Sequence, residues 1–281
     1  MLEVLYSKLN DINWTSKFKA FAVHLGISLV IFIVLLYLIL FEWYPFPFFS
    51  TDGGLQGMRL VFFIDMVLGP ILTFVVFRIG KHRLKFDLTV IAVMQFLALG
   101  WGVWTIRHEH PVAIVFTDDR YYPIPSYLLS EAGITQLDLE KYDDKTPARI
   151  YVDLPNENDP IARANFFKKA YQSQTPIFLF GQRYQKIDDI NFKKILAKSI
   201  NIDDYLKQDH IKNQSAQWRA IYTRFKTEST LPESKLAYIA FYARHGRFIL
   251  VINRETKEFV DVLEIKPPQT TQKSIQANTK K

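Results

Sequence analysis

Cysteine is absent from this chain of 281 residues. Without a thiol, the protein can form neither a disulfide nor a thiolate metal site. The sequence also lacks a G-x-S-x-G nucleophile motif, a phosphate-binding glycine loop and an H-E-x-x-H zinc motif. We therefore expect no enzyme, no metal site, no cofactor and no small-molecule substrate.

Long basic runs are missing too, and in the second part of the chain Lys and Arg are interleaved with acids, which argues against nucleic acid as a partner. His108-Glu109-His110 has the spacing of two metal ligands, but no third ligand is evident. Because this run directly follows an apolar segment, we interpret it as the polar flank of a membrane helix.

Charged residues are scarce in the first 106 positions, which hold 8 of the 35 Lys and Arg and 6 of the 28 Asp and Glu. Three apolar runs occupy this part, over residues 19–41, 60–77 and 88–106. Each run has close to the roughly 20 residues that cross a hydrocarbon core. The first run is too long for a cleaved signal peptide, and no small-x-small site follows it. Residues 1–106 are therefore predicted to form a membrane anchor of three transmembrane α-helices.

Basic residues are distributed unevenly around these runs. Seven flank the ends that share a side with the N-terminus: Lys8, Lys17, Lys19, Arg78, Lys81, Arg83 and Lys85. Only Arg59 and Arg107 flank the other ends, and the loop over residues 42–57 has neither Lys nor Arg. The positive-inside rule then predicts a multi-pass protein with its N-terminus in the cytoplasm and the chain after residue 107 in the periplasm of a bacterium. The aromatic residues of the loop are expected in the lipid head-group layer.

The remainder of the chain is typical of a soluble α+β domain over residues 107–265. Residues 112–116 and 148–154 are predicted strands, and the last part is predicted to form an antiparallel β-meander that supplies most of the sheet. Helices are expected over residues 124–132, 161–171, 190–200 and 216–225. The polar segment 266–281 is expected to be disordered.

Polar residues inside the apolar runs are the best candidates for function, because they are costly in lipid. Asp65 is expected near mid-depth, and His24, Thr73 and Gln95 are expected in one layer nearer the cytoplasm. Asp65 would be a neutral packing acid, bond a hydroxyl or water, or meet a group of another protein. Gly69-Pro70 is expected to bend or break the second helix.

Six segments together resemble a known family. They are SKFKAFAVHLGISL (16–29), WYPFPFF (43–49), IDMVLGPILTFVVF (64–77), KFDLTVIAVMQFLALGWGVWTI (85–106), HPVAIVFTDDRYYPI (110–124) and the meander from residue 238 to 265. In this order they resemble the type IV pilin accessory proteins, the TfpX/TfpZ family of the bacterial inner membrane. Residues 126–235 match only loosely.

The resemblance implies a non-enzymatic role, in which the protein stabilises one cognate type IV major pilin in the inner membrane and assists pilus assembly. The positions of this chain that match the pattern of the family are Asp65, Gly69, Pro70, Thr73, Asp87, Gln95, Asp119 and Arg120. The family more often has Phe where Tyr121 stands. A pilin helix carries a glutamate near its N-terminus, and we hypothesise that His24, Thr73 and Gln95 solvate that acid, while membrane lipids surround the rest.

Two other classes of function compete with this one. A membrane-bound enzyme that modifies the pilin would need a convergent polar pocket. A periplasmic sensor would need a cytoplasmic output domain, and the predicted cytoplasmic parts are too short to form one.

Overall fold

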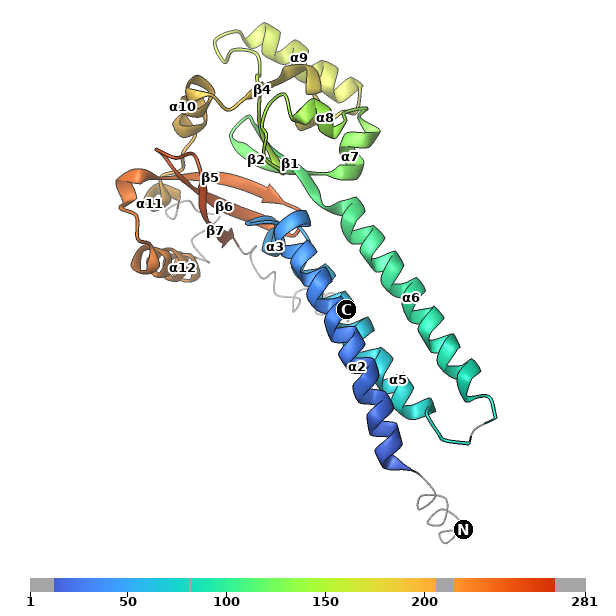
Figure 1. Cartoon of the computed structure of the whole chain (residues 1–281). Helices are drawn as coiled ribbons and strands as arrows, with labels where there is room; N and C mark the ends of the chain where they lie inside the picture. The colour runs from blue at the N-terminus through green and yellow to red at the C-terminus, as the bar shows by residue number, and fades with distance from the viewer. Residues whose placement is uncertain (1–12, 81, 206–214, 266–281) are drawn as a thin grey trace, which may run out of the picture. The chain divides into compact units, whose positions relative to one another are not determined.

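The computed structural model describes residues 13–80, 82–205 and 215–265 (Figure 1). Expectations for Lys8, Lys81 and the segment 266–281 lie outside these residues. The chain divides into two compact units. One unit, called here the membrane unit, comprises Met1–Pro111 and Pro125–Tyr127, and the other, called the soluble unit, comprises Val112–Ile124 and Leu128–Lys281.

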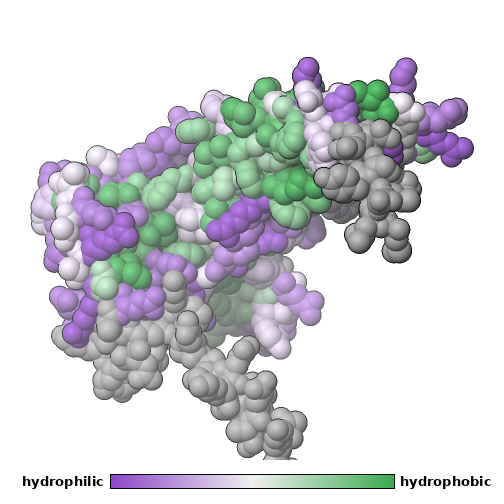
Figure 2. Space-filling view, turned by 90° about the horizontal axis from the view of Figure 1, so that it is seen from below, coloured by the Kyte–Doolittle hydropathy of each residue, from purple (hydrophilic) through white to green (hydrophobic). Residues whose placement is uncertain are grey.

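Three helices of the membrane unit are long and apolar enough to cross a membrane, over Trp14–Trp43, Gly54–Val76 and Leu84–Glu109. The three predicted spans are confirmed, with each helix extending beyond its apolar run. Span one begins at Trp14 because the Asn13 side chain caps it by accepting the Ser16 N–H. Figure 2 shows hydrophobic residues gathered on the helical part.

The spans consist of the following segments. Span one is α2 (Trp14–Tyr37) and the π-helix η1 (Leu38–Trp43), and span three is α6 (Leu84–Glu109). Span two is α4 (Gly54–Val61), the π-helix η2 (Phe62–Leu68) and α5 (Gly69–Val76).

Span two does not break at Gly69-Pro70, since it stays helical through both residues, and a bend there stays a prediction. The Gly69 N–H bonds the carbonyl of Ile64, five residues earlier, so the turn before Pro70 is a π-turn. Pro70 then occupies the first turn of α5, where a residue without an N–H is tolerated.

The loop between spans one and two is compact and contains the short helix α3 (Phe48–Thr51). Tyr44 and Phe48 are buried, and the Tyr44 hydroxyl donates a hydrogen bond to the carbonyl of Ile106 at 3.1 Å. These two rings therefore pack inside the membrane unit, and the placement of the loop in the head-group layer stays a prediction.

The soluble unit is built on a seven-stranded sheet of order β4-β3-β1-β2-β5-β6-β7. Its strands are β1 (Pro111–Thr117), β2 (Arg120–Pro125), β3 (Ala148–Val152), β4 (Tyr184–Lys186), β5 (Leu236–Ala243), β6 (Gly246–Asn253) and β7 (Phe259–Ile265). The antiparallel meander β5-β6-β7 is confirmed. The meander supplies 23 of the 44 strand residues, and four earlier strands supply the other 21. The parallel pairs β1–β3 and β2–β5 connect segments far apart in sequence, so local patterns do not predict them.

The helices of the soluble unit are α7 (Ser126–Glu131), α8 (Gln136–Leu139), α9 (Pro160–Gln172), α10 (Asp189–Ala197), α11 (Ile202–Tyr205) and α12 (Ser215–Glu228). Short 3-10 turns cover Ile177–Leu179, Gly181–Arg183 and Glu233–Lys235. The helix predicted from residue 124 starts only at Ser126, because β2 continues through Pro125.

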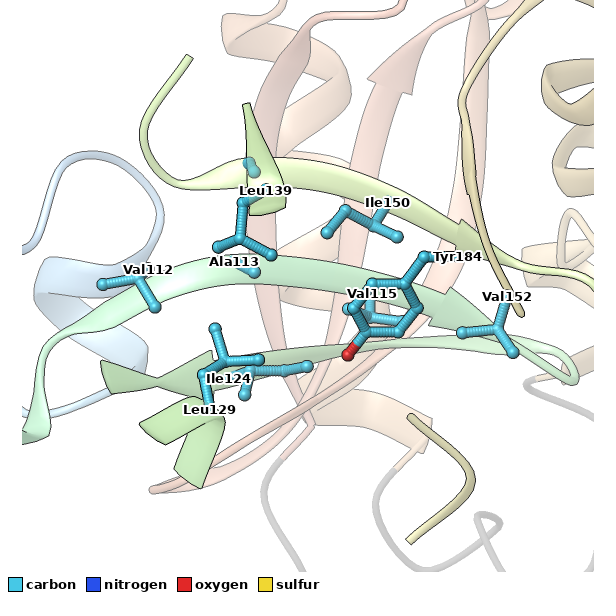
Figure 3. Close-up of a cluster of buried hydrophobic side chains, with 10 residues drawn as sticks. Val112, Ala113, Val115, Ile124, Leu129, Leu139, Ile150, Val152 and Tyr184 are labelled. Atoms are coloured by element: carbon cyan, nitrogen blue, oxygen red, sulfur yellow. The ribbon is translucent and has the colours of Figure 1, made fainter. Parts of the chain in front are cut away.

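Two of the hydrophobic clusters of the soluble unit cover its sheet. In one, Leu129 of α7 and Leu139 of α8 pack on β1 and β3 through Val115 and Ile150 (Figure 3). In the other, α11 and α12 cover the meander, with Trp218 at the centre.

Candidate intramembrane site

One face of span two carries the polar candidates of the membrane unit. Asp65, Gly69 and Thr73 follow one another at four-residue intervals, so they lie on one side of the helix, and all three are buried. Glycine at two places on this face, Gly57 and Gly69, lets the neighbouring helices approach closely. A Cβ at Gly57 would lie 2.9 Å from the Ile106 side chain of α6.

His24 and Thr73 form the first polar contact between spans one and two. The Nδ1 atom of His24 lies 2.6 Å from the hydroxyl oxygen of Thr73. The direction of this hydrogen bond depends on the tautomer of the ring. The second ring nitrogen, Nε2, faces Gly69, because a Cβ there would lie 2.9 Å from it.

Gln95 reaches the same place from span three. Its Nε2 atom would lie only 1.8 Å from a Cβ at Gly69, so the side-chain amide rests directly on the glycine. That nitrogen is buried and has no hydrogen-bond partner among the described residues. Gly69 is therefore the point at which polar side chains of spans one and three meet span two.

Asp65 lies one helical turn from Gly69, which corresponds to about 6 Å along the axis. Its side chain is 5% exposed, and the Ser28 hydroxyl donates a hydrogen bond to Oδ1 at 3.2 Å. The second oxygen, Oδ2, is buried without a hydrogen-bond partner. Sequence reasoning missed Ser28, although its position four residues after His24 places it on the same face of α2.

These side chains form a polar layer that can bind a hydrogen-bonding group. We call Ser28, His24, Asp65, Thr73 and Gln95 the polar layer. It contains one unsatisfied acceptor, on Asp65, and one unsatisfied donor, on Gln95. The π-turn η2 contains Asp65 and ends at Leu68, and such turns often occur at functional sites.

Asp119, Arg120 and Tyr121 lie in the soluble unit, at the turn between β1 and β2. Asp119 accepts a hydrogen bond from Arg120 at 3.0 Å and raises the pKa of the guanidinium further above its usual value. The Arg120 guanidinium also lies 4.4 Å from the ring centre of Tyr242. Tyr121 is 2% exposed, and its burial raises the pKa of its hydroxyl. Tyr121 is thus a core residue, unlike Arg120.

The His-x-His run is held by aromatic contacts. The His108 ring stacks on Trp104 at 4.9 Å and on Tyr127 at 5.5 Å. Within the residues that the structure describes, no group of three or more His, Cys, Asp or Glu could hold a metal ion.

The helices and the sheet define a three-span membrane protein with an α+β domain. The sequence model of the fimbrial assembly protein FimB family matches residues 12–53, which lie in the membrane unit. The fimbrial assembly protein of serogroups C1 and C2 from Dichelobacter nodosus is 36% identical over 104 residues, covering 36% of this chain and 79% of that relative. The chain therefore belongs to the FimB family of fimbrial assembly proteins.

Other relatives from the same bacterium are longer. The fimbrial assembly protein of serogroup I is 38% identical over 105 residues, and that of serogroup E1 is 36% identical over 104 residues. In each case the match covers 36% of this chain and 40% of the relative. No solved structure matches the chain.

Proposed function

We propose that this chain is a non-enzymatic accessory protein of fimbria assembly, which stabilises a cognate type IV major pilin in the bacterial inner membrane and assists its assembly into pili. The observation that carries this proposal is the match to proteins named for fimbrial assembly, together with a family model that falls in the membrane unit. The proposal includes the orientation expected from the charges, with the N-terminus in the cytoplasm and residues 107–265 in the periplasm.

The polar layer is the proposed contact for the membrane helix of the pilin. His24 and Thr73 already bond each other, so the donor available to a partner is Nε2 of Gln95. The Gln95 residue is half-buried while its Nε2 atom is buried against Gly69, so the proposal requires this side chain to turn outward to meet a helix that packs beside span three. A carboxyl group on that helix would gain a hydrogen bond that lipid cannot supply.

The alternative, an enzyme that modifies the pilin, has no support from the relatives, whose names describe assembly. A deletion of the gene separates the two functions. Loss of an accessory protein lowers both the amount of pilin in the membrane and the number of surface pili. Loss of a modifying enzyme leaves the amount of pilin unchanged and alters its mass.

A substitution within the layer tests the contact more narrowly. Gln95→Leu removes the donor and is expected to lower the amount of membrane pilin, whereas Met94→Leu, which alters an exposed side chain of the same helix, leaves it unchanged. If the pilin glutamate is the acceptor, replacing it with Leu, which has no acceptor, abolishes the difference between wild type and Gln95→Leu. An undiminished difference in that background would overturn the pairing.

A further inference from the structure

A basic turn joins β5 and β6. Three of its four residues from 244 to 247 are basic, namely Arg244, His245 and Arg247. The Arg247 guanidinium is exposed and lies 5.1 Å from the ring centre of Tyr242, the ring that Arg120 also contacts. This group of residues is called the basic turn surface.

Acids also lie beside these residues. Asp119 bonds Arg120, and Glu264 lies on β7 opposite Phe248, which is next to Arg247 on β6. Arg244, His245 and Glu264 each have a contact within the molecule. Arg244 and Arg247 lie at the turn itself, whereas Arg120 pairs with Ala240 on β5 and reaches the group through the ring of Tyr242.

The strand order places the basic turn surface at the end of the sheet where the chain enters from span three. β2 and β5 are parallel, with Tyr121 opposite Phe241, so the end of β5 lies level with the end of β2. β1 and β2 are neighbours joined by a two-residue turn, so the start of β1 lies at this end as well. Only His110 separates α6, which ends at Glu109, from β1.

The C-terminal end of β7 is also at this end of the sheet, since Ile265 pairs with Arg247. The sequence that follows contains four lysines and no acid: Lys266, Lys273, Lys280 and Lys281. The start of β1, the end of β7 and the turn between β5 and β6 thus lie at the end of the sheet that follows span three in the chain.

We propose that the basic turn surface binds the phosphate groups of anionic phospholipids in the membrane that the three helices cross. Guanidinium groups bind phosphate through paired hydrogen bonds, and tyrosine is suited to the interface between lipid and water. Lipid is favoured over an acidic protein because the short connection to span three keeps the bilayer always within reach of this end of the sheet. The proposal does not depend on the identity of the pilin.

The absence of cysteine allows a test with single dye labels on the full chain. His245→Cys carries the dye at the basic turn, and Thr256→Cys carries it at the turn between β6 and β7, the opposite end of the meander. The protein is placed in nanodiscs of phosphatidylcholine alone or mixed with phosphatidylglycerol, and a water-soluble quencher is added. At residue 245, quenching is expected to fall at least about threefold with the anionic lipid, and at residue 256 it is expected to stay the same.

Charge removal identifies the contacts. Each arginine near an anionic surface favours the bound state about fivefold, so Arg244→Gln with Arg247→Gln is expected to abolish the lipid-dependent protection, as is high salt. Lys168→Gln, which removes an exposed charge on α9, is the matched control. This variant is expected to retain the lipid-dependent protection. Unchanged hydrogen exchange of the β6 amides shows that the variants are folded.

Equal quenching at residue 245 in both lipids overturns the proposal. It is also overturned if protection persists in the double arginine variant. Protection that appears only when pilin is added, in either lipid, assigns the basic turn surface to a protein partner instead.

Discussion

The membrane unit and the soluble unit bury opposite kinds of residue. In the membrane unit, large apolar side chains are exposed, with Phe96 at 77% and Trp101 at 70%, whereas Asp65 and Thr73 are buried. In the soluble unit, Trp218 is 1% exposed and most charged residues lie on the surface. A hydrocarbon solvent does not drive apolar groups together, so close packing and polar contacts join the spans, while hydrophobic burial folds the soluble unit.

This difference indicates which of the two units is better suited to recognise a partner. In the soluble unit the ion pairs are exposed or half-buried, so most contribute little. In the membrane unit the few polar groups face one another at Gly69 and leave two atoms without a hydrogen bond. We therefore look for partner recognition in the polar layer rather than in a cleft of the sheet.

Removing the largest buried side chain of the soluble unit is expected to have the largest effect. Trp218→Ala leaves a cavity between α12 and the meander and destabilises the soluble unit by about 3–5 kcal/mol. Hydrogen exchange of the full chain in detergent should accelerate in β5–β7 and remain slow in α2 and α6. Leu137→Ala, at a side chain 71% exposed, serves as the control and costs less than about 0.5 kcal/mol. Loss of protection in all three spans would show that the units do not fold separately.

Adding a side chain where two helices pack closely is expected to destabilise the membrane unit. Gly57→Leu forces a side chain against Ile106 and destabilises the packing of span two on span three by up to about 3 kcal/mol. Gly100→Leu is the matched control, since a Cβ at Gly100 meets no atom within 4 Å. Thermal aggregation in detergent gives the melting temperature of each of the two variants. Equal melting temperatures for the two variants would contradict the close packing at Gly57.

The carboxyl group of Asp143 is expected to make the stability of the soluble unit depend on pH. Burial alone would raise the pKa of Asp143, but hydrogen bonds from the side chain and backbone of Arg149 and from the Lys145 backbone lower it. A lowered pKa means that the carboxylate stabilises the fold above about pH 4, and this stability is lost as the pH falls through the pKa of the folded state. Asp143→Asn is expected to cost about 1.5 kcal/mol at pH 7.

Urea unfolding, followed by hydrogen exchange in β3, measures this cost, and the difference from wild type should shrink as the pH falls below about 4. Glu228→Gln, at an exposed pair with Arg224, is the control without a measurable effect. A difference that persists in acid would show that Asp143 acts through packing rather than charge.

The smallest effect on stability is expected in the polar layer. Asp65→Asn keeps the shape and the bond from Ser28, and hydrogen bonds between membrane helices average about 0.6 kcal/mol. The melting temperature in detergent should therefore change little, while the amount of membrane pilin falls. A large loss of stability would assign Asp65 a purely structural role.

Much of the fold could be predicted from the sequence, because apolar length and period-two alternation are local signals. They located the three spans and the meander. β2 and β4 could not be found in this way, because β2 contains two prolines and β4 has only three residues. The parallel pairing of Tyr121 with Phe241 depends on contacts between residues 120 positions apart in the chain.

The candidate site could be predicted in part. Counting turns along the helices grouped His24, Thr73 and Gln95, which the structure places around Gly69. The role of Gly69 as the surface under the Gln95 amide could not be predicted, because it depends on how three helices pack. The π-turn was missed for the same reason, since Pro70 alone indicates a break.

The most direct test of the central claim is photo-crosslinking in living cells that make the cognate pilin. A photoreactive amino acid at position 95, in the polar layer, is compared with one at position 137, on the exposed surface of α8. The account predicts a pilin adduct from position 95 whose yield falls with Asp65→Asn. No pilin adduct from position 95, in cells where the protein is stable and pili are made, would contradict it.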